Sequence, residues 1–137
     1  NNDLGTTINR MRLRELTLEL LADLAAVRAL VQDLAAKHVD TVMPGFTHAV
    51  QAQPTTLAHF LLAFDAALER DGQRLREAYA RINLSTLGSG AFTTSGFALD
   101  RPRLAELLGF PGIAENSYGG VVGSSGGGKV EFATVLG

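Results

Sequence analysis

The chain has 137 residues, of which 46% are hydrophobic and 19% charged, and this suits one soluble globular domain or a piece of a larger protein. The net charge is -2 and the arginines are scattered among acidic residues, so no basic stripe predicts nucleic-acid binding. The absence of cysteine excludes disulfides and thiolate sites, and three well-separated histidines disfavour an ordinary zinc site. No apolar run is long enough to cross a bilayer and no signal peptide is recognisable, so a cytoplasmic location is the default expectation.

The first predicted element is a long helix over about residues 4–39. Apolar residues recur at spacings of three and four, which predicts one buried face formed by Leu13, Leu16, Leu20, Leu24, Val27, Val31 and Leu34. A second series of leucines and alanines covers a neighbouring face, and a helix with two apolar faces needs more than one partner. At 1.5 Å per residue the helix would extend for about 54 Å, longer than a compact domain of this size is wide.

A polar segment interrupts the helical pattern over residues 43–54. Pro44-Gly45 and Pro54 break a helix at its two ends, so we expect a loop at the tip of a helical hairpin. The loop carries four polar side chains, Thr47, His48, Gln51 and Gln53. Because His48 alone among them changes charge near neutral pH, the loop is a candidate site. The alternative is that His48 is satisfied by backbone groups and that Thr47 is an ordinary turn residue.

A second helix is predicted over about residues 56–83. Thr55 or Thr56 can cap its start, directly after Pro54, and apolar residues then repeat at heptad-like spacing. The two helices predict an antiparallel hairpin and an all-α fold. Their apolar faces require further helices, from this chain or from other subunits.

The last third is predicted to be loop-rich from 84 to 128. A short helix within it is capped by Asp100, has Pro102 in its first turn and ends at Gly109. Small residues such as Ser89 and Ser95 either line a cleft or serve a tightly folded loop. The glycines between 119 and 128 predict a flexible linker, and residues 129–137 begin a further helix. Because this last pattern stops with the chain, we expect a fragment.

The segment Thr41-Val-Met-Pro-Gly-Phe-Thr-His48 is followed by Gln51-Ala-Gln-Pro54. This segment resembles the histidine loop of the argininosuccinate lyases, a family of the fumarase/aspartase superfamily. Asn2-Asp3 with Thr7 resembles the segment that opens the family's central domain. The resemblance continues in order through Arg81-Ile-Asn83, Leu87-Gly-Ser-Gly-Ala91, Leu99-Asp-Arg101, Glu106-Leu-Leu-Gly-Phe110, Glu115-Asn-Ser117 and Val130-Glu-Phe132.

The resemblance implies an incomplete central helical domain that forms a bundle within a homotetramer. It implies elimination of an amine or a similar group from a substituted aspartate or succinate, giving fumarate or an analogue without a metal or organic cofactor. His48 is then catalytic, and Thr47 and Asn2 bind a small dicarboxylate-type substrate. Gln53 is included with the substrate-binding residues, although it could equally orient the loop. Asn2 could equally cap the first helix together with Asp3.

The chain departs from the family pattern at several positions. Val50 stands where the family has glutamine and Leu4 where glutamine is common, so the exact substrate is left open. The signature Gly-Ser-Ser-x-Met-Pro-x-Lys-x-Asn, which supplies the family's catalytic serine, does not occur. Ser124 and Ser125 lack its Met, Pro and Asn and are given no catalytic role. A helical scaffold or binding protein without the chemistry is therefore the alternative function.

Overall fold

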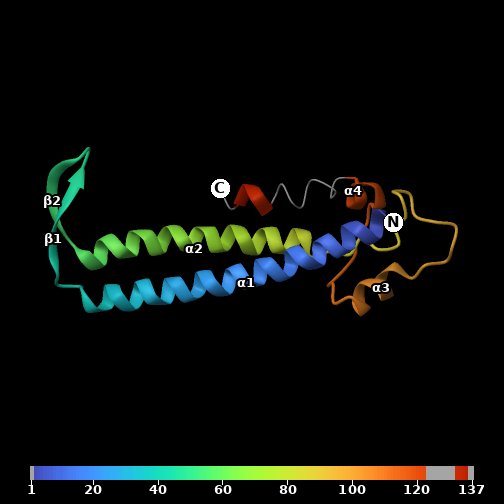
Figure 1. The fold of residues 1–137 in the computed structure, drawn as a ribbon, viewed down its shortest axis with the longest axis horizontal. Coiled ribbons are helices and arrows are strands. Elements are labelled where there is room, and N and C mark those ends of the chain that lie inside the picture. The colour runs from blue at the N-terminus through green and yellow to red at the C-terminus, as the bar shows by residue number, and fades with distance from the viewer. Residues whose placement is uncertain (1, 123–131, 136–137) are drawn as a thin grey trace. The chain divides into compact units, whose positions relative to one another are not determined.

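The computed structural model describes residues 2–122 and 132–135. In chain order the elements are α1 (Asn2–Lys37), β1 (Val42–Thr47), β2 (Val50–Thr56), α2 (Leu57–Ile82), α3 (Arg101–Leu107) and α4 (Ser117–Val121), labelled in Figure 1. Residues 132–135 are also helical. The chain is mostly helical, as the sequence predicted, and the limits of α1 and α2 differ from the predicted 4–39 and 56–83 by at most two residues.

Contacts divide the chain into two compact units, each described by itself. The first, here called the hairpin unit, comprises residues 20–73, and the second, the loop unit, comprises residues 1–19 and 74–137. Among the residues described, no helix combines the length and the hydropathy that crossing a membrane requires.

In the hairpin unit the C-terminal part of α1 and the N-terminal part of α2 run antiparallel and are joined by β1 and β2 (Figure 1). Backbone hydrogen bonds tie the helix ends together, from Leu57 N to the Thr41 carbonyl at 2.9 Å and from Ala58 N to the His38 carbonyl at 3.3 Å. The Thr56 hydroxyl accepts a hydrogen bond from His59 N at 3.2 Å and so caps α2, as predicted.

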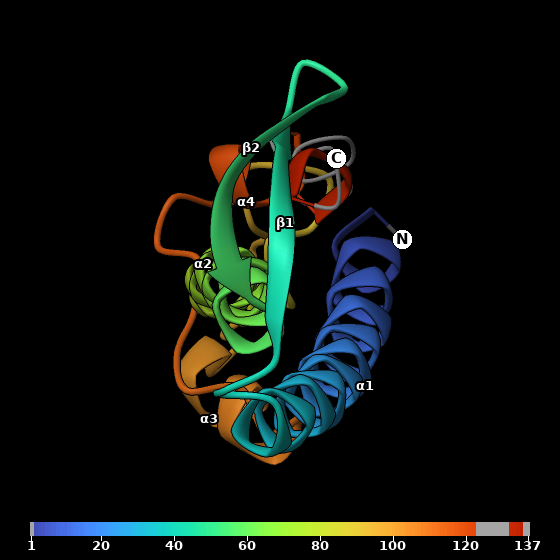
Figure 2. The same ribbon diagram turned by 90° about the vertical axis from the view of Figure 1, so that its left-hand side faces the viewer.

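The predicted loop is instead a two-stranded antiparallel sheet, shown in Figure 2. Thr47 pairs with Val50 and Pro44 with Pro54, with an irregularity between Pro44 and Phe46. The prolines end the helices without preventing strand pairing, because both strands lie at an edge and neither has to donate at every residue. The expectation of a loop was wrong because the turn lacks the Asn-Gly or Asp-Gly pair that normally signals a hairpin.

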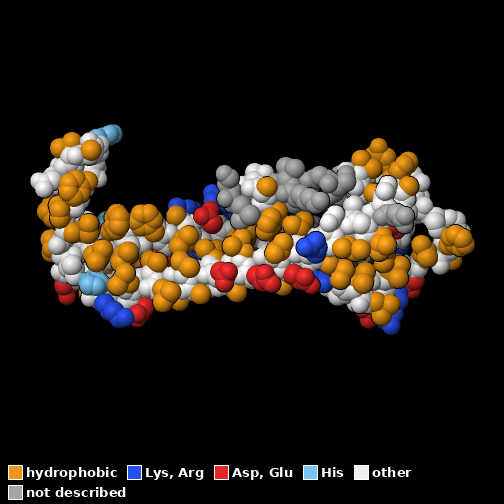
Figure 3. All heavy atoms as spheres, viewed as in Figure 1, with side chains coloured by type: hydrophobic (Ala, Val, Ile, Leu, Met, Phe, Trp, Pro, Cys, Tyr) orange, Lys and Arg blue, Asp and Glu red, His pale blue; other side chains and the backbone are white. Residues whose placement is uncertain are grey.

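The predicted apolar face of α1 is not fully buried. Leu16, Val27 and Leu34 are 50%, 48% and 44% exposed. The reason is geometric, since one neighbouring helix covers only one flank of a helix whose apolar residues spread over two. In the hairpin unit Leu30 and Phe64 are also exposed, and Figure 3 shows hydrophobic side chains over the visible surface of α2. The need for further helical partners therefore persists in the structure.

The loop unit has a small apolar core and an unusual number of buried hydroxyl groups. The core contains Leu75, Ala78, Ile82, Ala105, Phe110 and Val121, and the fully buried polar side chains include Thr7, Thr17, Ser85, Thr86 and Ser89.

Helix α3 begins and ends as predicted. Asp100 accepts a hydrogen bond from Arg103 N at 2.9 Å, and Gly109 follows the helix with φ +70°.

The predicted flexible linker is wrong at its start, because Gly119 and Gly120 lie in α4. Asn116 caps this helix by accepting a hydrogen bond from Gly119 N at 2.9 Å. A Cβ on Gly120 would lie 3.0 Å from the Ala114 Cβ and 3.3 Å from the Thr86 Cγ2, so this glycine permits close packing rather than flexibility. The rest of the predicted linker, residues 123–128, lies outside the described residues. Of the predicted further helix, only residues 132–135 are described.

Candidate functional site

The tip of the β-hairpin presents two of the predicted site residues side by side. Thr47 is the last residue of β1, and His48 and Ala49 form the turn before Val50. The φ angles of His48 and Ala49 are +51° and +61°, so both central residues are left-handed, as a type I′ turn requires. This conformation is uncommon for residues other than glycine, and each such residue costs of order 1–3 kcal/mol.

The tip carries one hydroxyl and one imidazole group. The Thr47 hydroxyl can donate a hydrogen bond to a carboxylate oxygen, and the His48 imidazole carries one ring nitrogen that can donate and one that can accept. Both side chains are exposed in the hairpin unit. They are therefore available to a ligand, but nothing in this unit shields them from water.

Gln53 does not share the tip with His48. It lies in β2, two residues further from the turn than Gln51, which pairs with Phe46. Its side chain is exposed. Its carbonyl oxygen would lie 2.7 Å from a Cβ on Gly45, so only glycine fits opposite it in the irregular part of the ladder. The backbone of Gln53 thus helps to shape the hairpin.

Asn2 belongs to the loop unit, whereas Thr47, His48 and Gln53 belong to the hairpin unit. It is the first residue of α1 and its side chain is exposed. Its carbonyl oxygen lies 3.0 Å from the Thr6 hydroxyl. Asn2 and Asp3 are both helical, so neither precedes the helix as the capping alternative required. Asp3 does accept a hydrogen bond from Leu4 N at 2.9 Å, with its Oδ1.

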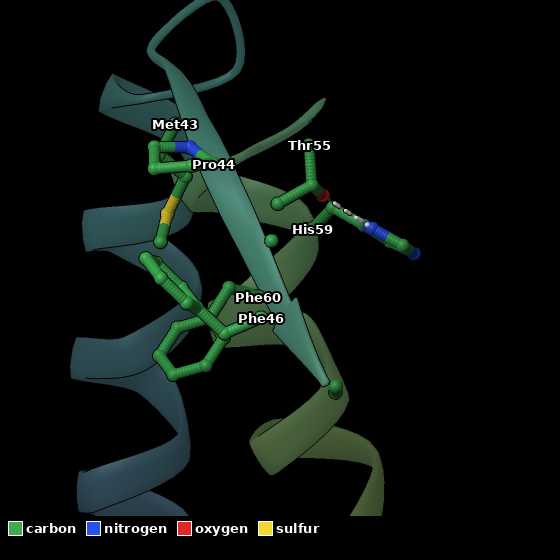
Figure 4. Close-up of a pocket in the computed structure, with 8 residues that line it drawn as sticks. Met43, Pro44, Phe46, Thr55, His59 and Phe60 are labelled. Atoms are coloured by element: carbon green, nitrogen blue, oxygen red, sulfur yellow. Dashed lines mark hydrogen bonds between the residues drawn. The ribbon is translucent and has the colours of Figure 1, made fainter. Parts of the chain in front are cut away.

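A groove beside the hairpin was not anticipated from the sequence. It has a volume of about 330 Å³ and is lined by Met43, Pro44, Gly45, Phe46, Thr55, His59, Phe60 and Ala63. Figure 4 shows Phe46 and Phe60 together on one side of β1, while the His59 ring points away from them. His59 Nδ1 lies 2.8 Å from the Thr55 hydroxyl. Because its lining is mostly apolar, the groove suits hydrocarbon contact better than a carboxylate.

The structure also decides between the alternatives for Ser89. This side chain is fully buried, and its Oγ accepts a hydrogen bond from Arg101 NH2 at 3.3 Å. It therefore serves a tightly folded loop, whereas Ser95 is exposed and accepts from Phe97 N at 3.2 Å. Within residues 2–122 and 132–135, no group of three or more His, Asp or Glu side chains is arranged to hold a metal ion.

Comparison with known proteins assigns the chain to a family. Residues 1–122 match the family model described as Lyase. The chain is 55% identical over 120 residues to the argininosuccinate lyase of Methanoculleus marisnigri, an alignment that covers 88% of this chain and 24% of that protein. It is 52% identical over 120 residues to the argininosuccinate lyase of Methanosarcina acetivorans, again over 88% of the chain and 24% of the relative.

The fold agrees with the sequence match. The crystal structure of EDDS lyase in complex with formate superimposes with a TM-score of 0.94 at 42% sequence identity, covering 98% of this chain and 27% of that one. The chain therefore belongs to the lyase family of the fumarase/aspartase superfamily, which confirms the resemblance seen in its motifs. Among its relatives it is similar to the argininosuccinate lyases, and it spans about a quarter of their length, 24%.

Proposed function

We propose that this chain is part of a lyase that eliminates an amine or a similar group from an N-substituted aspartate or succinate, releasing fumarate or an analogue. The similarity to argininosuccinate lyases at 55% and 52% identity supports the reaction class. EDDS lyase, whose fold matches at a TM-score of 0.94, supports the same class. A cytoplasmic homotetramer is part of the proposal.

The observation that carries the proposal is the backbone at the hairpin tip. A turn selected for stability alone favours Asn-Gly, because these residues adopt positive φ at little cost. This hairpin instead holds His48 and Ala49 at φ +51° and +61°. Strain of this kind, retained at an exposed turn, supports a functional role for the His48 side chain.

In the proposed mechanism, each group has a role that its chemistry permits. The Asn2 amide of one subunit and the Thr47 hydroxyl of another donate hydrogen bonds to carboxylate oxygens of the substrate, because the two residues lie at opposite ends of the helix Asn2–Lys37 and its connection. His48 assists departure of the leaving nitrogen by supplying a proton, as a positioned general acid. A general base, the role that the resemblance gives to a serine signature not found in this chain, accepts the proton from the carbon beside the carboxylate. Negative charge then builds on that carboxylate, so donors fixed around it stabilise the transition state. Gln53 completes the candidate substrate contacts.

The exposure of Thr47 and His48 bears on how such a site would be completed. Fixed donors stabilise developing charge most effectively where water is excluded. Both side chains are exposed in the hairpin unit, so the proposal requires other parts of the protein or other subunits to cover the tip. The exposed Leu30 and Phe64 on the neighbouring helices supply apolar surface for that packing.

The test is a kinetic comparison of the full-length protein with His48→Asn, assayed on a panel of N-substituted aspartates by the ultraviolet absorbance of the enoate product. We expect the substitution to lower kcat by at least about a hundredfold, the lower range for a general acid. His38→Asn is the matched control, since His38 lies at the base of the same hairpin and bonds Thr41 at 3.0 Å. An unchanged rate for His48→Asn would refute the proposed role, and a wild type without turnover would favour a scaffold.

A further inference from the structure

Hydrogen bonds join the first turn of α1 to the loop of residues 85–90. The proposed mechanism does not use these bonds. The Asp3 Oδ2 accepts from Gly88 N at 3.0 Å and from Gly90 N at 3.1 Å. The Asp3 N–H in turn donates to the Gly90 carbonyl at 3.3 Å. Hydrogen bonds to a carboxylate are about twice as strong as those between neutral groups. Asp3 therefore holds both glycines of this loop.

A second connection runs through buried hydroxyl groups. The Thr86 Oγ1 lies 2.8 Å from the Thr6 Oγ1 and 3.0 Å from the Thr7 Oγ1, and all three residues are more than nine-tenths buried. The Thr6 Oγ1 lies 3.0 Å from the Asn2 carbonyl oxygen, and the Thr7 hydroxyl donates to the Asp3 carbonyl at 2.7 Å. The loop thus reaches the backbone of Asn2 itself.

The loop is fixed from its other side by Arg101. This side chain donates to the Leu87 carbonyl at 3.4 Å, the Ser89 Oγ at 3.3 Å and the Ala114 carbonyl at 2.7 Å. Gly88 has φ +83°, and a Cβ there would lie 2.8 Å from the Arg101 Cγ. A loop restrained on both sides is a rigid support for whatever is attached to it.

We infer that Asp3 is a positioning residue for Asn2. Its carboxylate fixes the first turn of α1 on the rigid loop, and this fixes the backbone from which the Asn2 amide reaches the substrate carboxylate. The inference rests on the proposed function of Asn2. The competing explanation is that Asp3 only stabilises the end of a helix, as Asp100 does for α3.

The kinetic test uses the full-length protein with Asp3→Ala, Asp3→Asn, Asn2→Ala and the double variant Asp3→Ala with Asn2→Ala. A misplacement of about 1 Å can lower a rate a hundredfold, so we expect Asp3→Ala to lower kcat/KM by about tenfold to a hundredfold. Asp3→Asn should lose less, because the amide oxygen still accepts from the loop N–H groups.

The double variant separates positioning from plain stabilisation. If Asp3 acts through Asn2, adding Asp3→Ala to Asn2→Ala changes kcat/KM by less than about twofold, because coupled residues are not additive. Fully additive losses would overturn the inference. Asp100→Ala removes a carboxylate that accepts a backbone hydrogen bond at the start of α3, and it should leave kcat/KM unchanged. An equal loss in this control would also overturn the positioning role.

Amide hydrogen exchange gives a readout that needs no turnover. We expect the Gly88 and Gly90 amides to exchange faster in Asp3→Ala than in wild type or Asp100→Ala, with Asp3→Asn in between. Unchanged exchange of both amides in a folded Asp3→Ala protein would overturn the inference. A wild type without lyase activity would defeat the proposed function, and exchange would still decide whether Asp3 holds the loop.

Discussion

The Arg28 guanidinium on α1 forms a two-point hydrogen bond with the Asp65 carboxylate on α2, with Nε 2.8 Å from Oδ1 and NH2 3.3 Å from Oδ2. Gln32 adds a third bond, from its Nε2 to the Asp65 Oδ2 at 2.9 Å. Asp65 is only 7% exposed, so its charge depends on these partners. The bond from Arg28, followed by that from Gln32, lowers the pKa of Asp65, and the same bond raises the pKa of Arg28.

This arrangement predicts that the ion pair between the two helices loses its contribution to stability in acid. The folded pKa of Asp65 lies below its ordinary value of 3.8, so the pair contributes stability above that pH and loses it as the pH falls through the folded pKa. We expect Asp65→Asn to lower the urea midpoint at neutral pH and to flatten its decline in acid. Asp33→Asn removes an exposed pair with Lys37 and is the control that should change little. Parallel pH profiles for wild type and Asp65→Asn would contradict the prediction.

The hairpin tip predicts a stabilising substitution at Ala49. Its φ of +61° is costly for alanine and free for glycine, so Ala49→Gly should raise the free energy of unfolding by about 1 kcal/mol. Ala52→Gly, within β2 of the same hairpin, should instead lower it by about 0.5–1 kcal/mol. Urea titrations of the two variants, together with exchange of the hairpin amides, check the opposite signs. Equal changes in the free energy of unfolding from the two substitutions would refute the idea that the backbone at the tip is strained.

The helices and the cap of α3 could be predicted because their signals are local. Apolar spacing marks α1 and α2, and Asp100 with Pro102 marks the start of α3. Burial could not be read in the same way. Leu16 is 50% exposed because the partners that its apolar pattern requires are not within the chain described. Periodicity indicates which face of a helix is apolar, whereas burial depends on what packs against it.

The hairpin could not be predicted because its turn lacks the local Asn-Gly signal, and the polar clusters could not be predicted because their contacts join distant parts of the chain. Thr86 is buried and forms hydrogen bonds with Thr6 and Thr7, about eighty positions earlier in the sequence. A short window of sequence does not reveal such contacts. Asp65 is the one charged residue in the otherwise apolar run of residues 60–68, and this was the available sign of a buried ion pair. Thr47 and His48 stand out as polar residues in the break between two helical patterns, and the family resemblance gives them roles that stay predictions.

Gly120 and Gly119 give a matched test of packing in α4. A Cβ at Gly120 would crowd the Ala114 Cβ at 3.0 Å, whereas a Cβ at Gly119 would have its nearest neighbour, the Asn116 Oδ1, 3.6 Å away. We therefore expect Gly120→Ala to destabilise the protein by about 1–3 kcal/mol through overpacking. Gly119→Ala should be neutral or stabilising by up to about 1 kcal/mol, because alanine favours a helix. Thermal denaturation of both variants measures the difference in stability. An unchanged melting temperature for Gly120→Ala would favour the linker interpretation instead.

Val50 predicts a change of substrate preference. It pairs with Thr47 directly across the turn and is 65% exposed, and the resemblance to the family's histidine loop predicts glutamine at this position. If the tip contacts substrate as proposed, Val50→Gln adds an amide that can hydrogen-bond a polar substrate group. A net hydrogen bond contributes about 0.5–1.5 kcal/mol, so we expect kcat/KM for argininosuccinate to rise about threefold to tenfold relative to simpler N-substituted aspartates.

The same substitution at the base of the hairpin is the control for this prediction. Val42 is 72% exposed and pairs with Thr56, at the opposite end of the ladder from the turn. Val42→Gln therefore adds an identical amide to an equally exposed strand position, away from Thr47 and His48. Competition between two substrates in one assay measures the ratio of kcat/KM values without dependence on enzyme concentration. A ratio that shifts equally in both variants, or in neither, would show that position 50 does not select the substrate.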